Sequence, residues 1–140
     1  MLARLVDLEP EWIRWEDRPD TWTECVGDPL AWRPGDPTRQ VSGMREYVVH
    51  VSSLAEAQGI WFNCPVCGRT NTERRSHGLA VAFAGRGVLD HHGSRNADGH
   101  PTRWTVSGTS FEDLTLSPSV DLTVGNPGCW HGFVINGDVT

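Results

Sequence analysis

Two short clusters in the sequence contain residue types that bind metal ions in proteins. Cys64 and Cys67 stand in the pattern Cys-Pro-Val-Cys-Gly, and Cys129 and His131 stand in the pattern Cys-Trp-His-Gly. Structural zinc sites take four Cys or His ligands, usually as two pairs from separate parts of the chain. Gly68 suits the tight turn of the first pair, because glycine tolerates a positive φ. The spacing therefore predicts one structural zinc ion bound by Cys64, Cys67, Cys129 and His131.

The fourth ligand has a competitor in the sequence. His131 lies two residues after Cys129, so both side chains can point to one face of an extended strand. His77 is the alternative fourth ligand, because it lies ten residues after Cys67 at the start of an apolar segment. A Rieske iron–sulfur centre needs two Cys/His pairs, and the first pair here has no histidine at the matching place. We therefore expect zinc, with His131 or His77 completing the site.

The cysteines also allow a redox or disulfide interpretation. A redox Cys-x-x-Cys pair normally begins a helix within a thioredoxin-like βαβ pattern, whereas the residues after Gly68 are typical of a turn. Disulfides are favoured in oxidising compartments, and the first residues of the chain do not begin a secretory signal. We expect metal binding by the paired cysteines, and we expect Cys25, which stands alone, to be a small buried hydrophobic residue.

The composition limits the class of protein. A length of 140 residues fits one domain, and 15 Gly with 9 Pro indicate many turns. The net charge of −6 argues against nonspecific nucleic-acid binding, which depends on excess cationic charge at phosphates. The sequence contains no lysine, so Schiff-base and Walker-type lysine chemistry is excluded. No apolar stretch reaches the length of a membrane-spanning helix, and we expect a soluble intracellular protein.

The elements that must position the metal ligands are predicted to be strands. Stretches rich in β-branched, aromatic and other apolar residues indicate strands at residues 47–51, 60–62, 79–84, 104–107, 114–116 and 133–135. Asn136-Gly137 predicts a type I′ hairpin after the last of these, and Ser53 begins a capping box for one short helix over residues 54–58. The sequence predicts a mainly β (small α+β) fold, which is an antiparallel single domain stabilised by a zinc knuckle.

The N-terminal third has a different character. It is acidic and rich in tryptophan, and prolines interrupt it at positions 10, 19, 29, 34 and 37. Such a density of proline disfavours long regular elements, although residues 12–15 could form a short edge strand. We expect residues 1–46 to be a Pro/Trp-rich arm that packs on the body or extends from it, and residues 47–140 to be the zinc-binding β-rich domain.

Several of these motifs together resemble a family of small phage and prophage proteins of unknown function. The shared features are a Cys-x-x-Cys knuckle, a Trp-x-x-x-Gly stretch, a Leu-Ser-Pro-Ser box and a closing Cys-x-His-Gly hairpin. They are matched here by Cys64, Cys67, His77, Trp104, Leu116 to Val120 and Cys129 to Val139. The resemblance covers roughly residues 45–140. It implies a phage origin, a metal-binding core, and the host cytoplasm or the virion as the location, and it implies no activity.

Three functions are compatible with these features. The first is a noncatalytic protein-interaction module, in which a closed zinc site holds the fold while a surface binds a phage or host protein or a second copy of the chain. The second is a decoration or connector component of the virion, whose arm reaches a neighbouring subunit. The third is a metal-dependent hydrolase that uses the loop at residues 90–100.

The loop of the hydrolase hypothesis holds several possible ligands, namely Asp90, His91, His92, Asp98 and His100. It is also rich in glycine and has few apolar anchors, and such a loop holds ligands poorly to the tolerance that a catalytic ion requires. We therefore expect Asp90, His91, His92 and His100 to be largely solvated and to bind no second metal ion.

Overall fold

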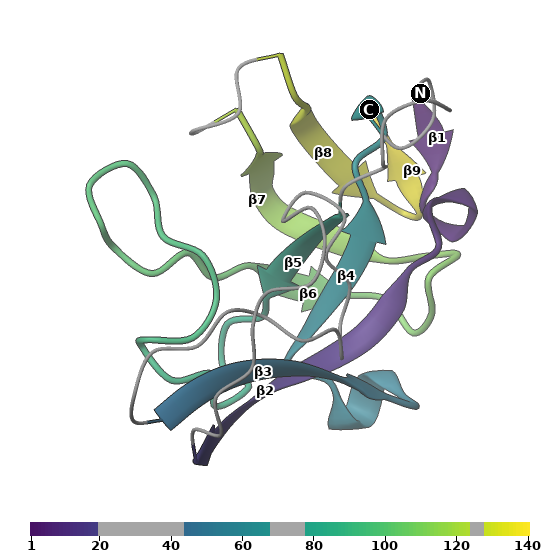
Figure 1. The fold of residues 1–140 in the computed structure, drawn as a ribbon. Coiled ribbons are helices and arrows are strands. Elements are labelled where there is room, and N and C mark those ends of the chain that lie inside the picture. Colours follow the sequence, from purple (N-terminus) through teal and green to yellow (C-terminus); the bar gives the residue numbers. More distant parts are fainter. Residues whose placement is uncertain (20–43, 68–77, 124–127) are drawn as a thin grey trace.

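The described residues form two antiparallel sheets, which confirms the mainly β prediction. A computed structural model describes residues 1–19, 44–67, 78–123 and 128–140 of the chain (Figure 1). In chain order the strands of these ranges are β1 (Ala3–Arg4), β2 (Glu11–Pro19), β3 (Met44–Val51), β4 (Gly59–Asn63), β5 (Gly78–Ala82), β6 (Thr105–Ser107), β7 (Thr115–Asp121), β8 (His131–Ile135) and β9 (Asp138–Val139). One sheet has the order β3-β2-β4-β5 and the other the order β1-β9-β8-β7-β6.

The four-stranded sheet buries apolar side chains on both of its faces. In β4, Ile60 and Phe62 point to one face and Trp61 to the other, as the two-residue period of a strand requires. The first face packs against the five-stranded sheet to form the main core. The second face is covered in part by the loop at residues 85–103, since a Cβ placed on Gly93 would lie 3.8 Å from the Trp15 ring. The sheet is therefore an internal layer at this point.

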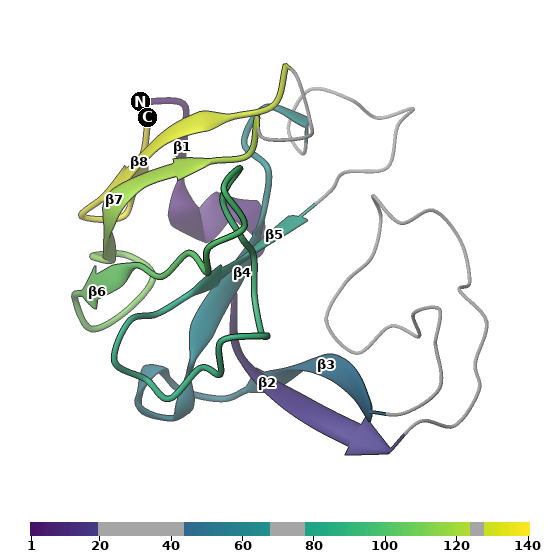
Figure 2. The same ribbon diagram turned by 90° about the vertical axis from the view of Figure 1, so that its left-hand side faces the viewer.

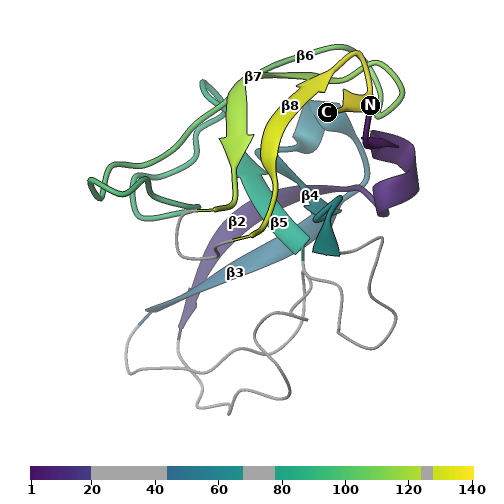
Figure 3. The same cartoon turned by 90° about the horizontal axis from the view of Figure 1, so that it is seen from above.

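The two sheets stack with their strands crossing. Figure 2 shows β7 and β8 above β4 and β5, and Figure 3 shows the crossing from above. Leu116 and Val120 of β7 and Val134 of β8 are buried between the layers. Pairing of Ala3 with Val139 brings the two ends of the chain together (Figure 1).

The closing hairpin forms as the sequence predicts. Asn136 and Gly137 have φ values of 50° and 78°, which are the positive values that a type I′ turn requires, and Ile135 pairs with Asp138 across the turn. The strand expected at residues 114–116 continues through Ser117-Pro118-Ser119 to Asp121 as β7, with a register shift between Leu116 and Val120.

The segment at the N-terminus differs most from expectation. The strand expected at residues 12–15 lies inside the sheet, because β2 pairs with β3 on one side and β4 on the other. Pro10 precedes this strand and Pro19 is its last residue, so neither proline removes a hydrogen bond from its middle. Residues 20–43 of the expected arm, with Cys25, lie outside the described residues.

The helical elements among the described residues are short 3-10 helices, η1 (Leu5–Leu8) and η3 (Leu54–Glu56). The short helix expected at residues 54–58 is thus a single 3-10 turn. Its expected capping residue, Ser53, makes no side-chain hydrogen bond to the helix. Within the described ranges, no helix is long and apolar enough to cross a membrane.

Candidate metal centres

Three of the four predicted ligands come together in the structure. Cys64 follows the last residue of β4, Cys67 lies three residues further in a turn, and Cys129 precedes β8. Their sulfur atoms all lie within 4.8 Å of one another, and the Sγ atoms of Cys67 and Cys129 are 3.6 Å apart. Zn–S bonds of about 2.3 Å in a tetrahedron place two sulfurs about 3.8 Å apart. The cluster therefore has the dimensions of a thiolate metal site.

The turn that carries the first two cysteines has the local bonding of a knuckle. The backbone N–H of Cys67 donates a hydrogen bond to Sγ of Cys64 at 3.5 Å. Such a bond fixes the chain so that both sulfur atoms face one point, and it stabilises negative charge on the acceptor sulfur. No disulfide bond joins these three cysteines to one another.

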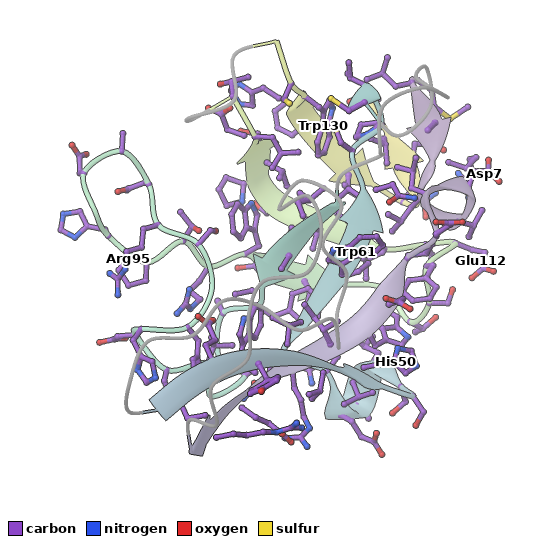
Figure 4. The ribbon with its side chains drawn as sticks, viewed as in Figure 1. Asp7, His50, Trp61, Arg95, Glu112 and Trp130 are labelled. Carbon is purple, nitrogen blue, oxygen red and sulfur yellow. The ribbon has the colours of Figure 1, made fainter. Side chains whose placement is uncertain are left out.

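The sulfur cluster is part of the main core. Cys64 is fully buried, and Trp130, which follows Cys129, packs edge-on against Phe62 with ring centroids 6.1 Å apart. Figure 4 shows sulfur atoms close to Trp130. Burial, together with the neighbouring sulfurs of Cys129 and Cys64, raises the pKa of Cys67 to about 12. A bound cation would reverse this effect, because metal coordination deprotonates a thiol.

His131 does not join the three sulfurs. Its Nε2 lies 3.2 Å from the hydroxyl of Ser119, and its Nδ1 lies 3.8 Å from a carboxylate oxygen of Asp121. The side chain is on the exposed face of β8, whereas Trp130 points inward. Cys129 and His131 do not share a strand face as the sequence predicts, because β8 begins only at His131. The alternative ligand, His77, lies outside the described residues.

A second cluster joins β2 to the loop at residues 85–103. The two oxygens of Asp17 lie 2.8 Å from Nε2 of His91 and 2.7 Å from Nε2 of His92. These three ligand atoms also lie within 4.8 Å of one another. Hydrogen bonds from His92 and from His91 lower the pKa of Asp17. Asp17 is not recognisable as a ligand in the sequence, since no spacing connects it to a pair of residues more than seventy positions away.

The expectation that the whole histidine loop is solvated is wrong for one residue. The side chain of His92 is only 4% exposed, because it packs beneath the loop against Asp17. Asp90, Asp98 and His100 are exposed, as expected, and they belong to neither cluster. The structure therefore does not bring together all the ligands considered for a hydrolase. Instead, His91 and His92 lie beside Asp17.

Trp104 lies in the main core beside the sulfur cluster. It is 8% exposed and belongs to the same apolar cluster as Cys64, Leu116 and Val120. Its indole N–H donates a hydrogen bond to the backbone oxygen of Ser119 at 3.1 Å. The buried tryptophan thus connects the end of the loop to β7.

No known protein family, curated protein or solved structure matches this chain. The resemblance to phage proteins stays a prediction from the motifs. Any functional conclusion therefore depends on the geometry of the two clusters.

Proposed function

We propose that this chain is a small noncatalytic protein, held together by one structural zinc ion and acting through a protein partner. The observation that carries the proposal is the convergence of sulfurs from both sheets. Cys64 follows β4 of the four-stranded sheet, and Cys129 precedes β8 of the five-stranded sheet. An ion bound to both would tie the two layers together at one end of the core.

The donor set favours zinc over other ions. Thiolates are soft ligands, and sets of three cysteines with one histidine occur in tetrahedral zinc sites. In this proposal the fourth ligand is His77, or His131 if its side chain turns from Ser119 toward the sulfurs. A site filled by four protein ligands leaves no position for a reacting water, which is why we assign it a structural role.

An apolar strip on the outer face of the five-stranded sheet supports a binding role. Phe133 and Ile135 of β8 are 49% and 52% exposed, and Leu2 is 43% exposed. Phe133 pairs with Thr140, and Leu2 binds the neighbouring Val139 through its backbone N–H. β9 lies between β1 and β8, so Leu2, which precedes β1, lies across β9 from Phe133 and Ile135. We assign this apolar strip as the contact for an apolar surface of a protein partner.

Metal analysis tests the zinc site. We expect native mass spectrometry to find one zinc ion per chain, and the Co²⁺-substituted protein to show the strong visible absorption of a tetrahedral thiolate site. His131→Ala and His77→Ala, compared in the same assay, identify the fourth ligand as the one whose loss weakens binding. Cys25→Ser is the matched control and should retain the ion. A folded chain that binds no metal would contradict the proposal.

The contact strip is tested by a surface variant. Phe133→Ser combined with Ile135→Thr keeps the strand pattern and removes the apolar side chains. Sedimentation velocity compares the variant with the parent chain for self-association, and a partner isolated with the parent chain is then tested for binding to both. Equal assembly and equal partner binding by the two chains would remove the strip from the proposal and leave the zinc site in place.

A further inference from the structure

We propose that Asp17, His91 and His92 form a second metal site, which binds a divalent transition-metal ion through a carboxylate oxygen and two imidazole nitrogens. Nothing in this inference depends on the sulfur cluster. It starts from the separations of 2.8 Å and 2.7 Å between the carboxylate oxygens of Asp17 and the two Nε2 atoms. Metal–ligand bonds of about 2.1 Å at right angles place two ligands about 3.0 Å apart, so little movement is needed to admit an ion.

The backbone of the loop produces this convergence. Side chains of consecutive residues in an extended chain point to opposite sides, but the N–H of His92 bonds to the oxygen of Leu89 at 2.9 Å and closes a turn. The two imidazole rings consequently lie on the same side, with centroids 4.2 Å apart. Both Nε2 atoms then reach the one carboxylate of Asp17.

The loop is anchored on both sides of the histidines, despite its glycines. The guanidinium group of Arg103 donates hydrogen bonds at 2.8 Å to the backbone oxygens of Leu89 and His92. The N–H of Gly93 donates to a carboxylate oxygen of Glu46 at 3.1 Å. These bonds fix the chain immediately before and after the ligands. The glycine content of the loop is therefore no obstacle to precise ligand placement.

The local charge favours a cation. Glu46 is the cross-strand partner of Asp17 in the β2–β3 pairing, so the two carboxylates lie on the same face of the sheet. With neutral imidazoles, these four side chains carry two negative charges, which one divalent ion neutralises. Two arginines of the loop, Arg95 and Arg103, donate their guanidinium hydrogen bonds to backbone oxygens. Asp17 is ionised at neutral pH, since its pKa is lowered.

The donor types and their exposure indicate what the site would bind. Imidazole and carboxylate ligands suit Zn²⁺, Ni²⁺, Co²⁺ and Fe²⁺, whereas three of the four ligands proposed for the first cluster are sulfurs. His92 is buried, but the side chains of Asp17 and His91 are 25% and 57% exposed. An ion held here would therefore face solvent on one side and keep positions for water or a small anionic ligand.

A titration of the zinc-loaded chain with Ni²⁺ alone tests the inference. Isothermal calorimetry should show one Ni²⁺ per chain, with binding at least tenfold weaker in Asp17→Asn and in His91→Gln. His100→Gln is the matched control, because it makes the same change in the same loop outside the cluster, and it should bind as the parent does. Both test positions are partly exposed, so the variants should fold, which circular dichroism and unchanged zinc content verify.

Two results would overturn the second site. One is the absence of Ni²⁺ binding by the parent chain at millimolar concentration, which would make the cluster a hydrogen-bonded carboxylate between two histidines. The other is equal binding by the parent, Asp17→Asn and His91→Gln chains. Because zinc at the sulfur cluster is measured in the same samples, failure of this site is distinguishable from failure of the proposed structural zinc.

Discussion

The two clusters use three ligand-type side chains each, and they differ in what they connect. The sulfur cluster lies in the main core and joins residues that flank strands of different sheets. The cluster of Asp17, His91 and His92 joins one strand to a surface loop and is open on one side. An ion in the first position would hold the fold together, whereas an ion in the second would only fix a loop. The environment, more than the number of ligands, separates a structural centre from an accessible one.

Removal of one sulfur should have the largest effect on the molecule. In Cys64→Ser we expect loss of zinc and of the folded state, because the binding free energy of structural zinc is also folding free energy. Circular dichroism with and without a chelator measures this for the parent chain and the variant. An unchanged melting temperature of the parent chain after removal of the metal would contradict a structural role for the zinc ion.

The apolar core beside the sulfur cluster should provide the next largest effect. Trp104→Ala removes a buried indole and its hydrogen bond to Ser119, and we expect a loss of about 3–5 kcal/mol in the free energy of unfolding. Urea denaturation of the zinc-saturated protein measures the loss. Trp104→Phe retains most of the apolar contact and should lose about half as much or less. A Trp104→Ala chain with unchanged stability would mean that the two sheets are held by the metal alone.

The sequence predicts those parts of the fold that depend on local patterns. Strands β3, β4 and β5 follow from their β-branched and aromatic composition, and the turn at Asn136-Gly137 follows from its need for positive φ. The place of β2 inside the sheet does not follow, since its partners are fixed by tertiary packing. Prolines at the two ends of β2 also resemble prolines that break a strand, and only the pairing shows the difference.

Local sequence patterns likewise predict the sulfur cluster, whereas the cluster of Asp17, His91 and His92 depends on tertiary packing. Cys64 and Cys67 are recognisable because their spacing builds the turn that orients them. The exclusion of His131 from the sulfur group depends on where β8 begins, which the sequence leaves open by one or two residues. Asp17 could not be paired with His91 and His92, because their contact depends on how the loop folds back over the sheet.

The number of protons released on metal binding should also differ between the two clusters. We expect this effect to be smaller than the two losses of stability described above. The raised pKa of Cys67, about 12, keeps its thiol protonated at neutral pH in the metal-free chain. Zinc must displace that proton, so the apparent zinc affinity should rise with pH by up to about tenfold per pH unit for each proton released. Asp17 has a lowered pKa and has already lost its proton well below neutral pH, so a metal ion bound there displaces none from this carboxylate.

Calorimetry in two buffers with different ionisation enthalpies counts the protons released. Zinc binding to the metal-free chain should show a buffer-dependent enthalpy near neutral pH. The same measurement on Cys67→Ser, if this variant folds, should give a smaller proton count. Zinc binding without proton release would show that the thiols are already ionised before the metal arrives.

The smallest effect is expected at the tip of the loop, which is separate from its anchored base. The side-chain oxygen of Asn96 accepts hydrogen bonds from the N–H groups of Asp98 and His100 at 3.0 Å each. Arg95, which Figure 4 places on the projecting part of the loop, donates to the backbone oxygens of Gly99 and Asp90. The backbone of the tip is thus held by bonds within the loop, and the imidazole of His100 is exposed.

His100→Ala should therefore change nothing that either cluster controls. We expect unchanged zinc content, unchanged Ni²⁺ binding and a free energy of unfolding within about 0.5 kcal/mol of the parent value, as is usual for an exposed position. The same three measurements on His91→Gln should leave zinc unchanged and weaken Ni²⁺ binding. If His100→Ala weakens Ni²⁺ binding as much as His91→Gln does, then the tip folds onto Asp17 in the loaded protein. The second centre would then draw its ligands from the whole loop and not from its base alone.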